Sequence, residues 1–468
     1  MAGTIFFTTI QSVVTYKLNQ HSMKAILFAV LGLFIAGSLT AQQTTILTNA
    51  TIIDGAGHDP QPNMAMIIQG GRITKITRGK ISVPDNAVQI DMTGKYLMPE
   101  LINCHGHLGN LRDTTANSAN YTRDNVIRQL KHYEDYGVGA VLSMGTEQPL
   151  GLSIRDDSRA GLLPGATMYS AIFGFGVKGA MPPEAAGFTS IYRPETPEEA
   201  ARNVDELSAW HPDVIKIWVD NYYGQFQTSM KEEVYTAIIA QAHKHGIRVA
   251  AHLYHLADAH KLVAAGLDIM AHSIRDGEID DALIEEMKAK HVAYIPTLSL
   301  DEFAIAYLDD PSWVNDPFFR NSLEPGVYNM ITSQAYKDKL AKSPVTPQEK
   351  EALKYALINL RKLYKAGILV ALGTDSGATP IRTQGFSEHL ELELMVQAGL
   401  TPLEAIKVGT CNGARLLGID ADQGSLEPGK RANFLVLDKD PITDIRNTRT
   451  LSAVWSDGVK VSDGPHAQ

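Results

Sequence analysis

Short apolar runs that end in a metal-binding side chain recur along this chain, and the first of them ends in His105-Gly106-His107. Later runs end in a lysine, two histidines and an aspartate, which are Lys216, His252, His272 and Asp375. In a barrel of parallel strands the carboxyl ends of all strands open on one mouth, where active sites are built. The order therefore predicts that these side chains meet. Because imidazole and carboxylate suit zinc and its neighbours, it also predicts a metal site.

Strand-like and helical segments alternate through the central part of the chain. Eight segments are typical of strands: 96–104, 140–144, 166–172, 214–219, 248–252, 269–272, 293–297 and 369–373. Helices are expected between them, for example over 232–244, 256–265 and 347–366. Alternation predicts a parallel sheet in an α/β fold, and eight units predict a closed (β/α)8 TIM-type barrel over residues 99–421.

Two connections in this central part are unusually long, 173–200 and 298–347, and each follows the carboxyl end of a predicted strand. Long loops at that end of a barrel are usually lids or substrate walls, so both are expected to border the mouth. For the second connection, a helical insertion packed on the outside is the equal alternative.

Both ends of the chain carry the strand and turn patterns of a small β domain. Gly70-Gly71 separates two strand-like runs, and Asp457-Gly458 forms a similar turn near the other end. Such turns between alternating runs predict hairpins. We therefore expect residues 42–98 and 422–463 to form one small β-sandwich domain beside the barrel.

Residues 1–41 have the pattern of an upstream extension followed by a signal peptide. Met23-Lys24 precedes an apolar stretch over 25–39, and Ala41 offers a small residue for cleavage. The stretch is shorter than the ~20 residues that a membrane span needs. It predicts a periplasmic or extracellular protein whose mature chain begins near Gln42 and has no stable membrane span. A membrane anchor is the alternative.

Composition limits the partners. The net charge of −10 argues against nucleic acid or an anionic membrane surface as the main partner, and 44% hydrophobic residues are enough for a large core. The expected partner is a small-molecule substrate, and a homo-oligomer is compatible with this composition. The two cysteines, Cys104 and Cys411, give no disulfide framework, and Cys104 is expected to be a buried strand residue.

Individual residues suggest chemistry. His105 and His107 are two apart on a strand, so both side chains emerge on one face. Burial and nearby cations lower the pKa of a lysine, and Lys216 would then be a free amine. Asp375 is a candidate ligand and proton shuttle, which could take a proton from water and deliver it to a leaving nitrogen.

Three further residues are weaker candidates. Tyr254, two residues beyond His252, is a candidate donor to a carbonyl oxygen that gains negative charge, with an ordinary aromatic loop residue as the alternative. Arg275 could bind a substrate carboxylate or form a surface ion pair. His389 follows the last predicted strand closely enough to support the site, although a position away from it is favoured.

The residues around these positions resemble the amidohydrolase superfamily, in its imidazolonepropionase-like and prolidase-like branch. The resemblance covers about residues 44–463. The resemblance rests on the order of the candidate ligands along the chain and on two segments. These are Leu97-Met98-Pro99-Glu100-Leu101-Ile102-Asn103-Cys104-His105-Gly106-His107 and the segment that begins Gly424-Ser425-Leu426-Glu427-Pro428-Gly429. Glu100 stands where that family usually has Gly, and Asn103 where it usually has Asp. Altered packing near the first strand is therefore expected, without loss of metal.

The resemblance implies two Zn²⁺ ions held by His105, His107, His252, His272 and Asp375 and bridged by a carbamylated Lys216. It implies an enzyme that cleaves an amide-type C–N bond through metal-bound hydroxide, with a dipeptide or N-acyl amino acid as substrate. The alternatives are a cyclic amide or ester hydrolase, a mononuclear deaminase-like enzyme, and a non-catalytic binding module. An amine that replaces one metal or binds a substrate anion is the alternative for Lys216.

Overall fold

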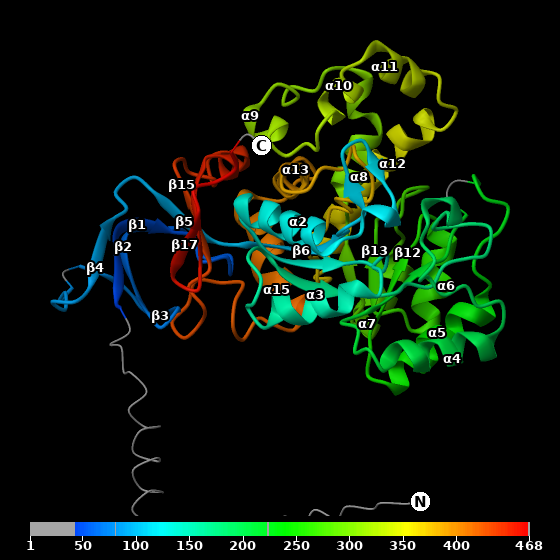
Figure 1. The fold of residues 1–468 in the computed structure, drawn as a ribbon, viewed down its shortest axis with the longest axis horizontal. Helices are drawn as coiled ribbons and strands as arrows, with labels where there is room; N and C mark the ends of the chain where they lie inside the picture. Colours follow the sequence, from blue (N-terminus) through cyan, green and yellow to red (C-terminus); the bar gives the residue numbers. More distant parts are fainter. Residues whose placement is uncertain (1–42, 80, 222–223, 467–468) are drawn as a thin grey trace, which may run out of the picture. The chain divides into compact units, whose positions relative to one another are not determined.

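The computed structural model describes residues 43–79, 81–221 and 224–466 (Figure 1). The predicted extension and signal peptide at 1–41 lie outside these described residues. Thr44–Gln468 forms one compact unit, and the following description concerns that unit. Among the described residues, no helix is both long enough and apolar enough to cross a bilayer.

Strands from both ends of the chain pair in one eight-stranded mixed sheet, in the order β17-β16-β15-β5-β1-β2-β3 with β4 on β1 (blue and red in Figure 1). Their bounds are β1 Thr45–Ile52, β2 Gln61–Gln69, β3 Arg72–Arg78, β4 Val88–Asp91, β5 Tyr96–Pro99, β15 Phe434–Leu437, β16 Leu451–Ser456 and β17 Val459–Ser462. The hairpins expected at Gly70-Gly71 and Asp457-Gly458 join β2 to β3 and β16 to β17. The shared sheet is therefore observed, whereas its arrangement as a sandwich stays a prediction.

Two parallel sheets form the central part. One has the order β10-β9-β6 and the other β11-β12-β13-β14. Their strands are β6 Leu101–Gly106, β9 Val138–Ser143, β10 Thr167–Ser170, β11 Ile215–Trp218, β12 Val249–His252, β13 Ile269–Ala271 and β14 Ala293–Ile295. A short hairpin of β7 (Leu111–Arg112) and β8 (Thr115–Ala116) follows β6. The strands β6, β11 and β12 are buried along their whole length, as parallel strands covered on both faces must be.

Two predicted strands differ from the observed ones. The run 96–104 is divided into β5 and β6 at Glu100, whose buried carboxylate occupies the space beside Gly139: a Cβ there would lie 2.0 Å from Glu100 Oε2. The run 369–373 is not a regular strand. It still lies between β14 and β6, because Tyr294 N donates to Leu369 O (2.9 Å) and Cys104 N donates to Leu372 O (2.8 Å).

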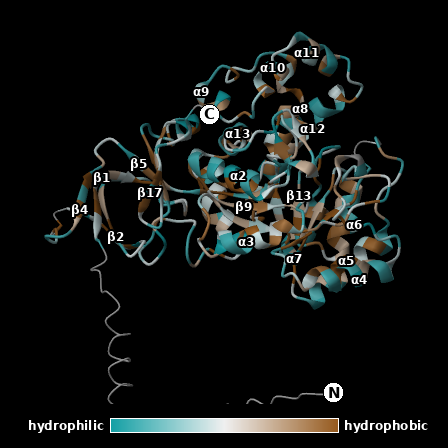
Figure 2. Ribbon diagram, viewed as in Figure 1, coloured by the Kyte–Doolittle hydropathy of each residue, from teal (hydrophilic) through white to brown (hydrophobic). Residues whose placement is uncertain are grey.

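Helices flank the parallel strands. The longer ones are α2 Arg123–Asp135, α3 Leu150–Arg159, α4 Pro197–Ser208, α5 Glu232–Lys244, α6 Leu256–Ala265, α7 Asp281–Lys290, α12 Thr346–Lys365 and α13 Phe386–Gln397, and the last two short ones are α14 Pro402–Lys407 and α15 Gly413–Leu417. The bounds predicted for α5 and α6 are confirmed. On α5, Val234, Ile238 and Ala242 recur at helical spacing and are buried, so one stripe faces the core. Figure 2 shows brown and teal faces on α4 and α5.

The connection predicted at 298–347 is a packed helical layer. It contains α8 Leu298–Ile305, α9 Pro317–Arg320, α10 Val327–Ile331 and α11 Gln334–Ala341. Trp313 anchors it, with its ring centroid 4.6 Å from that of Phe319 and 5.1 Å from that of Phe386 on α13. Burial of these aromatic rings stabilises the layer, and α8 packs on α12 and α13. The alternative of a helical insertion therefore describes this segment.

Candidate active site

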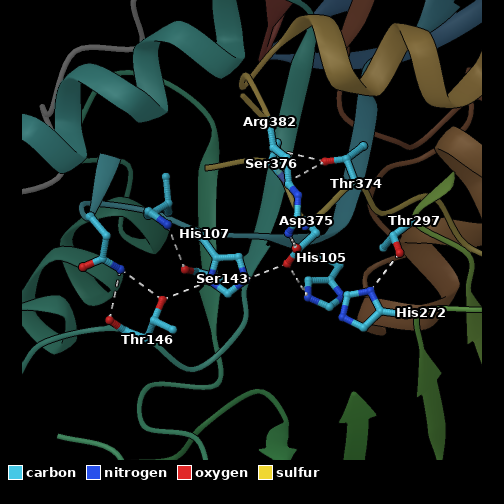
Figure 3. A network of polar contacts seen from close by, with 12 residues as sticks. His105, His107, Ser143, Thr146, His272, Thr297, Thr374, Asp375, Ser376 and Arg382 are labelled. Carbon is cyan, nitrogen blue, oxygen red and sulfur yellow. Dashed lines mark hydrogen bonds and ion pairs between the residues drawn. The ribbon is translucent and has the colours of Figure 1, made fainter. Parts of the chain in front are cut away.

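Four histidines from three strand ends lie together in the core (Figure 3 shows three of them). His105 and His107 flank the end of β6, His252 ends β12, and His272 follows β13. The imidazole centroid of His272 lies 4.6 Å from that of His105 and 4.5 Å from that of His252. All four side chains are buried. The strand ends that the sequence predicted to meet therefore do meet.

Asp375 completes this cluster from the segment that follows residues 369–373. Its Oδ1 lies 2.9 Å from His107 Nε2 and 3.3 Å from His105 Nε2, and its backbone N–H donates to His105 O (2.7 Å). Ligand atoms of His105, His272 and Asp375 all lie within 4.8 Å of one another, a spacing that one metal ion could occupy. The donor set of imidazole and carboxylate is one that zinc and similar ions accept.

Lys216 lies in the middle of β11 with its side chain fully buried, and its Nζ forms no hydrogen bond. Burial lowers the pKa of its amine to about 7, although Asp375 and Asp220 oppose that shift. The predicted free amine near neutral pH is therefore consistent with its surroundings. Its Nζ lies 5.5 Å from the ring centroid of Trp218, so an aromatic face closes one side of it.

Electrostatics favour the protonation states that metal binding needs. Burial, followed by the charge of Lys216, lowers the pKa of His105 to about 3, and burial also lowers the pKa values of His252 and His272. Burial alone would raise the pKa of Asp375, but Arg382 and the imidazoles hold it well below its usual range. Neutral imidazoles beside an ionised carboxylate are the ligating forms, and His105 Nδ1 is buried without a hydrogen bond. These residues fit a divalent cation.

Three side chains orient the histidine rings. Thr146 Oγ1 lies 2.9 Å from His107 Nδ1, Thr297 Oγ1 lies 2.8 Å from His272 Nδ1, and Asp220 Oδ2 lies 3.2 Å from His252 Nε2. Such contacts fix ring orientation and tautomer in metal sites. The sequence alone does not point to these three residues. Their only signal is position, because each lies shortly beyond the carboxyl end of a parallel strand.

A buried polar network supports the cluster from behind, around Glu388 on α13. Glu388 Oε1 accepts from Asn103 Nδ2 (2.7 Å), Thr374 Oγ1 (2.7 Å) and Ser376 Oγ (2.9 Å). Asn103 Oδ1 in turn accepts from the backbone N–H of His105 (2.9 Å). The network thus ties β6 to the segment that carries Asp375, and the residues that donate to Glu388 lie within two residues of the candidate ligands His105 and Asp375 in the sequence.

Glu391, one turn further along α13, anchors the start of α8. Its two carboxylate oxygens accept from Leu298 N (2.8 Å) and Ser299 N (2.7 Å), next to Thr297. Burial raises the pKa of Glu391 from 4.5 to about 8. A carboxyl group with a raised folded-state pKa contributes stability that is complete below about pH 4.5 and is lost as pH rises through about 8.

Glu391→Gln is therefore expected to flatten the pH dependence of stability. Wild-type protein should lose free energy of unfolding between pH 5 and pH 8, whereas the variant should lose less over that interval. At pH 5 the variant should be about 1–2 kcal/mol less stable, since the amide accepts one backbone hydrogen bond fewer. Urea unfolding at both pH values measures this, and equal pH slopes for the two proteins would contradict it.

A cavity of about 470 Å³ opens over the cluster. Four of the predicted ligands line it, namely His107, His252, His272 and Asp375. Met181, Pro182, Pro183 and Phe188 form part of its wall, so the predicted long connection at 173–200 does border the site. Arg382 also lines the cavity and contacts Asp375 Oδ2, and it is a residue to which no sequence motif points.

Three weaker candidates lie elsewhere. Tyr254 and Arg275 line a separate hollow of about 540 Å³. Arg275 forms an ion pair with Asp301 (Nη1 to Oδ1, 3.2 Å). This pair is buried, unlike the surface ion pair that was one of the two alternatives for Arg275. The guanidinium of Arg275 lies 4.9 Å from the ring centroid of Tyr254. His389 lies against Thr448 Oγ1 and Tyr136 O, away from the cluster. The roles predicted for Tyr254 and Arg275 stay predictions.

Known proteins resemble this chain over most of its length. The amidohydrolase family profile matches residues 96–461. An ochratoxinase of Aspergillus niger is 24% identical over 92% of this chain and 89% of its own length. An imidazolonepropionase of Deinococcus deserti is 42% identical, but over only 22% of this chain and 26% of its own length. The crystal structure of a Bifidobacterium longum protein assigned as a prolidase covers 91% of this chain and 96% of its own, with 27% identity and a TM-score of 0.71.

The ends of parallel strands bring imidazoles and a carboxylate together under a cavity. This arrangement is that of a mixed α/β enzyme with a candidate metal centre. The chain belongs to the amidohydrolase family and is a hydrolase of that family. The family and its structural neighbours imply an α/β fold of the TIM-barrel type.

Proposed function

We propose that this chain is a binuclear metal-dependent hydrolase that cleaves an amide-type C–N bond in a dipeptide or N-acyl amino acid. One observation carries the proposal: four buried imidazoles, Asp375 and a buried lysine amine without a hydrogen bond gather beneath one cavity. The similarity of this chain to a protein assigned as a prolidase and to an ochratoxinase supports the proposal. We also propose that the substrate is a small molecule. The fold proposed for residues 99–421 is a closed barrel, and residues 42–98 with 422–463 form the second domain.

Two zinc ions would be held by His105, His107, His252, His272, Asp375 and a carbamate on Lys216. In forming the carbamate, the neutral Lys216 amine attacks carbon dioxide. An N–C bond forms as one C=O π bond breaks, and one proton leaves the nitrogen, which turns a neutral amine into an anion. When bound, the ions would supply an activated water and polarise the amide carbonyl.

The chain's own residues would handle binding and proton transfer. Asp375, held ionised by Arg382 and the imidazoles, can accept a proton on its carboxylate and return it to the leaving nitrogen. Thr146, Thr297 and Asp220 keep the imidazoles oriented. Pro182, Pro183 and Phe188 line the cavity and would limit the access of bulk water to it.

Closure of the barrel is supported at the gaps between the two parallel sheets. Phe175 N donates to Lys216 O (2.7 Å) and links the segment after β10 to β11. The segment 369–373 links β14 to β6 through the bonds of Leu369 and Leu372. All these links run between neighbours that a closed eight-stranded barrel would bring together.

Metal content tests the binuclear site. Protein expressed with zinc and bicarbonate is expected to contain close to two divalent ions per chain, because its ligand set includes a bridging anion. Elemental analysis of active enzyme measures this. One ion per active chain would overturn the binuclear proposal and favour a mononuclear, deaminase-like enzyme. Turnover of a library of dipeptides and N-acyl amino acids by the zinc-loaded protein tests the reaction itself.

Export is a separate proposal, which rests on the sequence of residues 1–41. In the native host the mature chain is expected to begin near Gln42, because cleavage after Ala41 removes the apolar run. N-terminal sequencing of the protein from that host measures this. A mature form that retains residues 25–39 would indicate an anchor or a protein that is not exported.

A further inference from the structure

Arg382 lies in a loop pressed against a metal-binding histidine. The loop follows Asp375 and closes on itself, with Gly377 N donating to Arg382 O (2.8 Å) and Arg382 N donating to Thr379 O (3.1 Å). Gly377 has φ +83°, and a Cβ there would lie 2.2 Å from His107 O. Only glycine fits this close approach. The position of Arg382 relative to the metal-binding strand is therefore fixed by backbone contacts.

The guanidinium of Arg382 contacts the outer side of the Asp375 carboxylate. It meets Oδ2, while Oδ1 faces His107 and His105 (Figure 3). Arg382 keeps 14% of its side chain exposed and lines the cavity. Among the described residues that line this cavity, and apart from the candidate metal ligands, Arg382 carries the single formal charge.

Part of the cavity wall is apolar. It includes Met181, Pro182, Phe188, Trp218 and Phe226. Arg275, for which the sequence leaves substrate binding and a surface ion pair equally open, is 2% exposed, is paired with Asp301, and does not line this cavity. The cavity thus presents one cation beside the candidate metal-binding cluster, together with an apolar wall.

We propose that Arg382 binds a substrate carboxylate next to the scissile amide, and that the apolar wall takes the adjoining side chain. The preferred substrates are then N-acylated apolar amino acids or dipeptides with a free carboxylate, rather than their neutral amides. The planar guanidinium has five N–H donors, so it can serve a substrate carboxylate while it still contacts Asp375. This inference rests on the proposed amide hydrolysis and deepens it by naming the recognised group.

A matched substrate pair tests the proposal with zinc-loaded enzyme. N-acetyl-L-phenylalanine and N-acetyl-L-phenylalaninamide share the same scissile bond and differ in charge at the carboxyl end. Wild-type kcat/KM is expected to favour the acid by about 30-fold, the range of a charge-assisted hydrogen bond. Arg382→Gln should bring that ratio close to one. Any effect of the substitution on Asp375 reduces turnover of both compounds and leaves the ratio unaffected.

Two further variants sharpen the result. Arg382→Lys keeps the positive charge but loses the planar guanidinium that can hold both carboxylate oxygens. It should therefore give an acid-to-amide ratio between those of wild type and Arg382→Gln. Arg275→Gln, checked for folding by circular dichroism, should keep the wild-type ratio. If a variant has no measurable turnover, calorimetric binding of the same two compounds gives the ratio instead.

The outcomes separate the two proposals. A wild-type enzyme that hydrolyses both compounds equally, or an Arg382→Gln variant that keeps the preference, would overturn the role of Arg382 while amide hydrolysis stands. A wild-type enzyme that hydrolyses neither these compounds nor any member of the dipeptide and N-acyl library would overturn amide hydrolysis. Calorimetry would then still decide whether Arg382 recognises the carboxylate.

Discussion

Lys216→Ala is expected to lose metal and activity together, with fewer than two divalent ions per chain and kcat/KM lower by about 1,000-fold. In the proposed site a carbamate on Lys216 places negative charge between two cations. Removing that anion leaves their repulsion in a fully buried pocket, so at least one ion should leave. Elemental analysis and steady-state kinetics on the same preparation measure both effects.

Three controls distinguish this chemistry from general damage. Lys216→Arg should fail as well, because a guanidinium stays positive and cannot form a carbamate. Acetate or propionate added to Lys216→Ala should restore part of the activity by supplying a carboxylate. Lys261→Ala, at a side chain that is 58% exposed, should behave like wild type. A Lys216→Ala enzyme with two ions and near-normal turnover would make Lys216 a structural strand residue.

The clustering of the candidate ligands could be predicted because it follows from strand geometry. His105, Lys216 and His252 lie on β-strands or at their carboxyl ends, and parallel strands bring those ends to one place whatever the loops do. The face of the sheet to which each side chain points also follows, because side chains alternate between the two faces along a strand. Both rules depend only on local pattern, and a single sequence displays local pattern directly.

Residues beyond the strand ends are harder to place from the sequence, because those rules stop there. Tyr254 follows the end of β12 by two residues, so strand alternation no longer sets its direction, and it turns toward Arg275. Asp375 has φ +55°, outside extended geometry, which fits the irregular course after residues 369–373. Arg382 and Glu388 depend on contacts that a loop and α13 make with distant strands. No periodic pattern signals such contacts.

The two departures from the family pattern in the first strand were visible in the sequence, and the structure supplies their physical basis. Glu100 fills the space beside Gly139. Asn103 is fully buried and donates to Glu388, whose pKa is raised by burial although Thr374 and Ser376 oppose that shift. An amide at position 103 suits this arrangement, because it can donate to Glu388 and accept from His105 N with its two different ends.

Asn103→Asp is therefore expected to be strongly destabilising, although Asp is the residue that the family usually has. Two carboxyl groups would face each other at the 2.7 Å that now separates Asn103 Nδ2 from Glu388 Oε1, and one of them must bind a proton. We expect a loss of about 3–5 kcal/mol at pH 8, as for a buried charge left without its partner. Metal affinity should fall too, since Asn103 holds the backbone of His105.

The pH dependence and a second substitution identify the cause. The pair's raised folded-state pKa makes its stability complete below the unfolded-state pKa and lost as pH rises, so the deficit of Asn103→Asp should be smaller at pH 5 than at pH 8. Adding Glu388→Gln returns a donor opposite the new carboxylate and should recover both stability and metal binding, whereas Glu388→Gln alone should not improve either. Urea unfolding and zinc titration of the four proteins measure this cycle. Equal deficits at both pH values, or no recovery in the double variant, would show that Asn103 acts through packing and not through its hydrogen bond to Glu388.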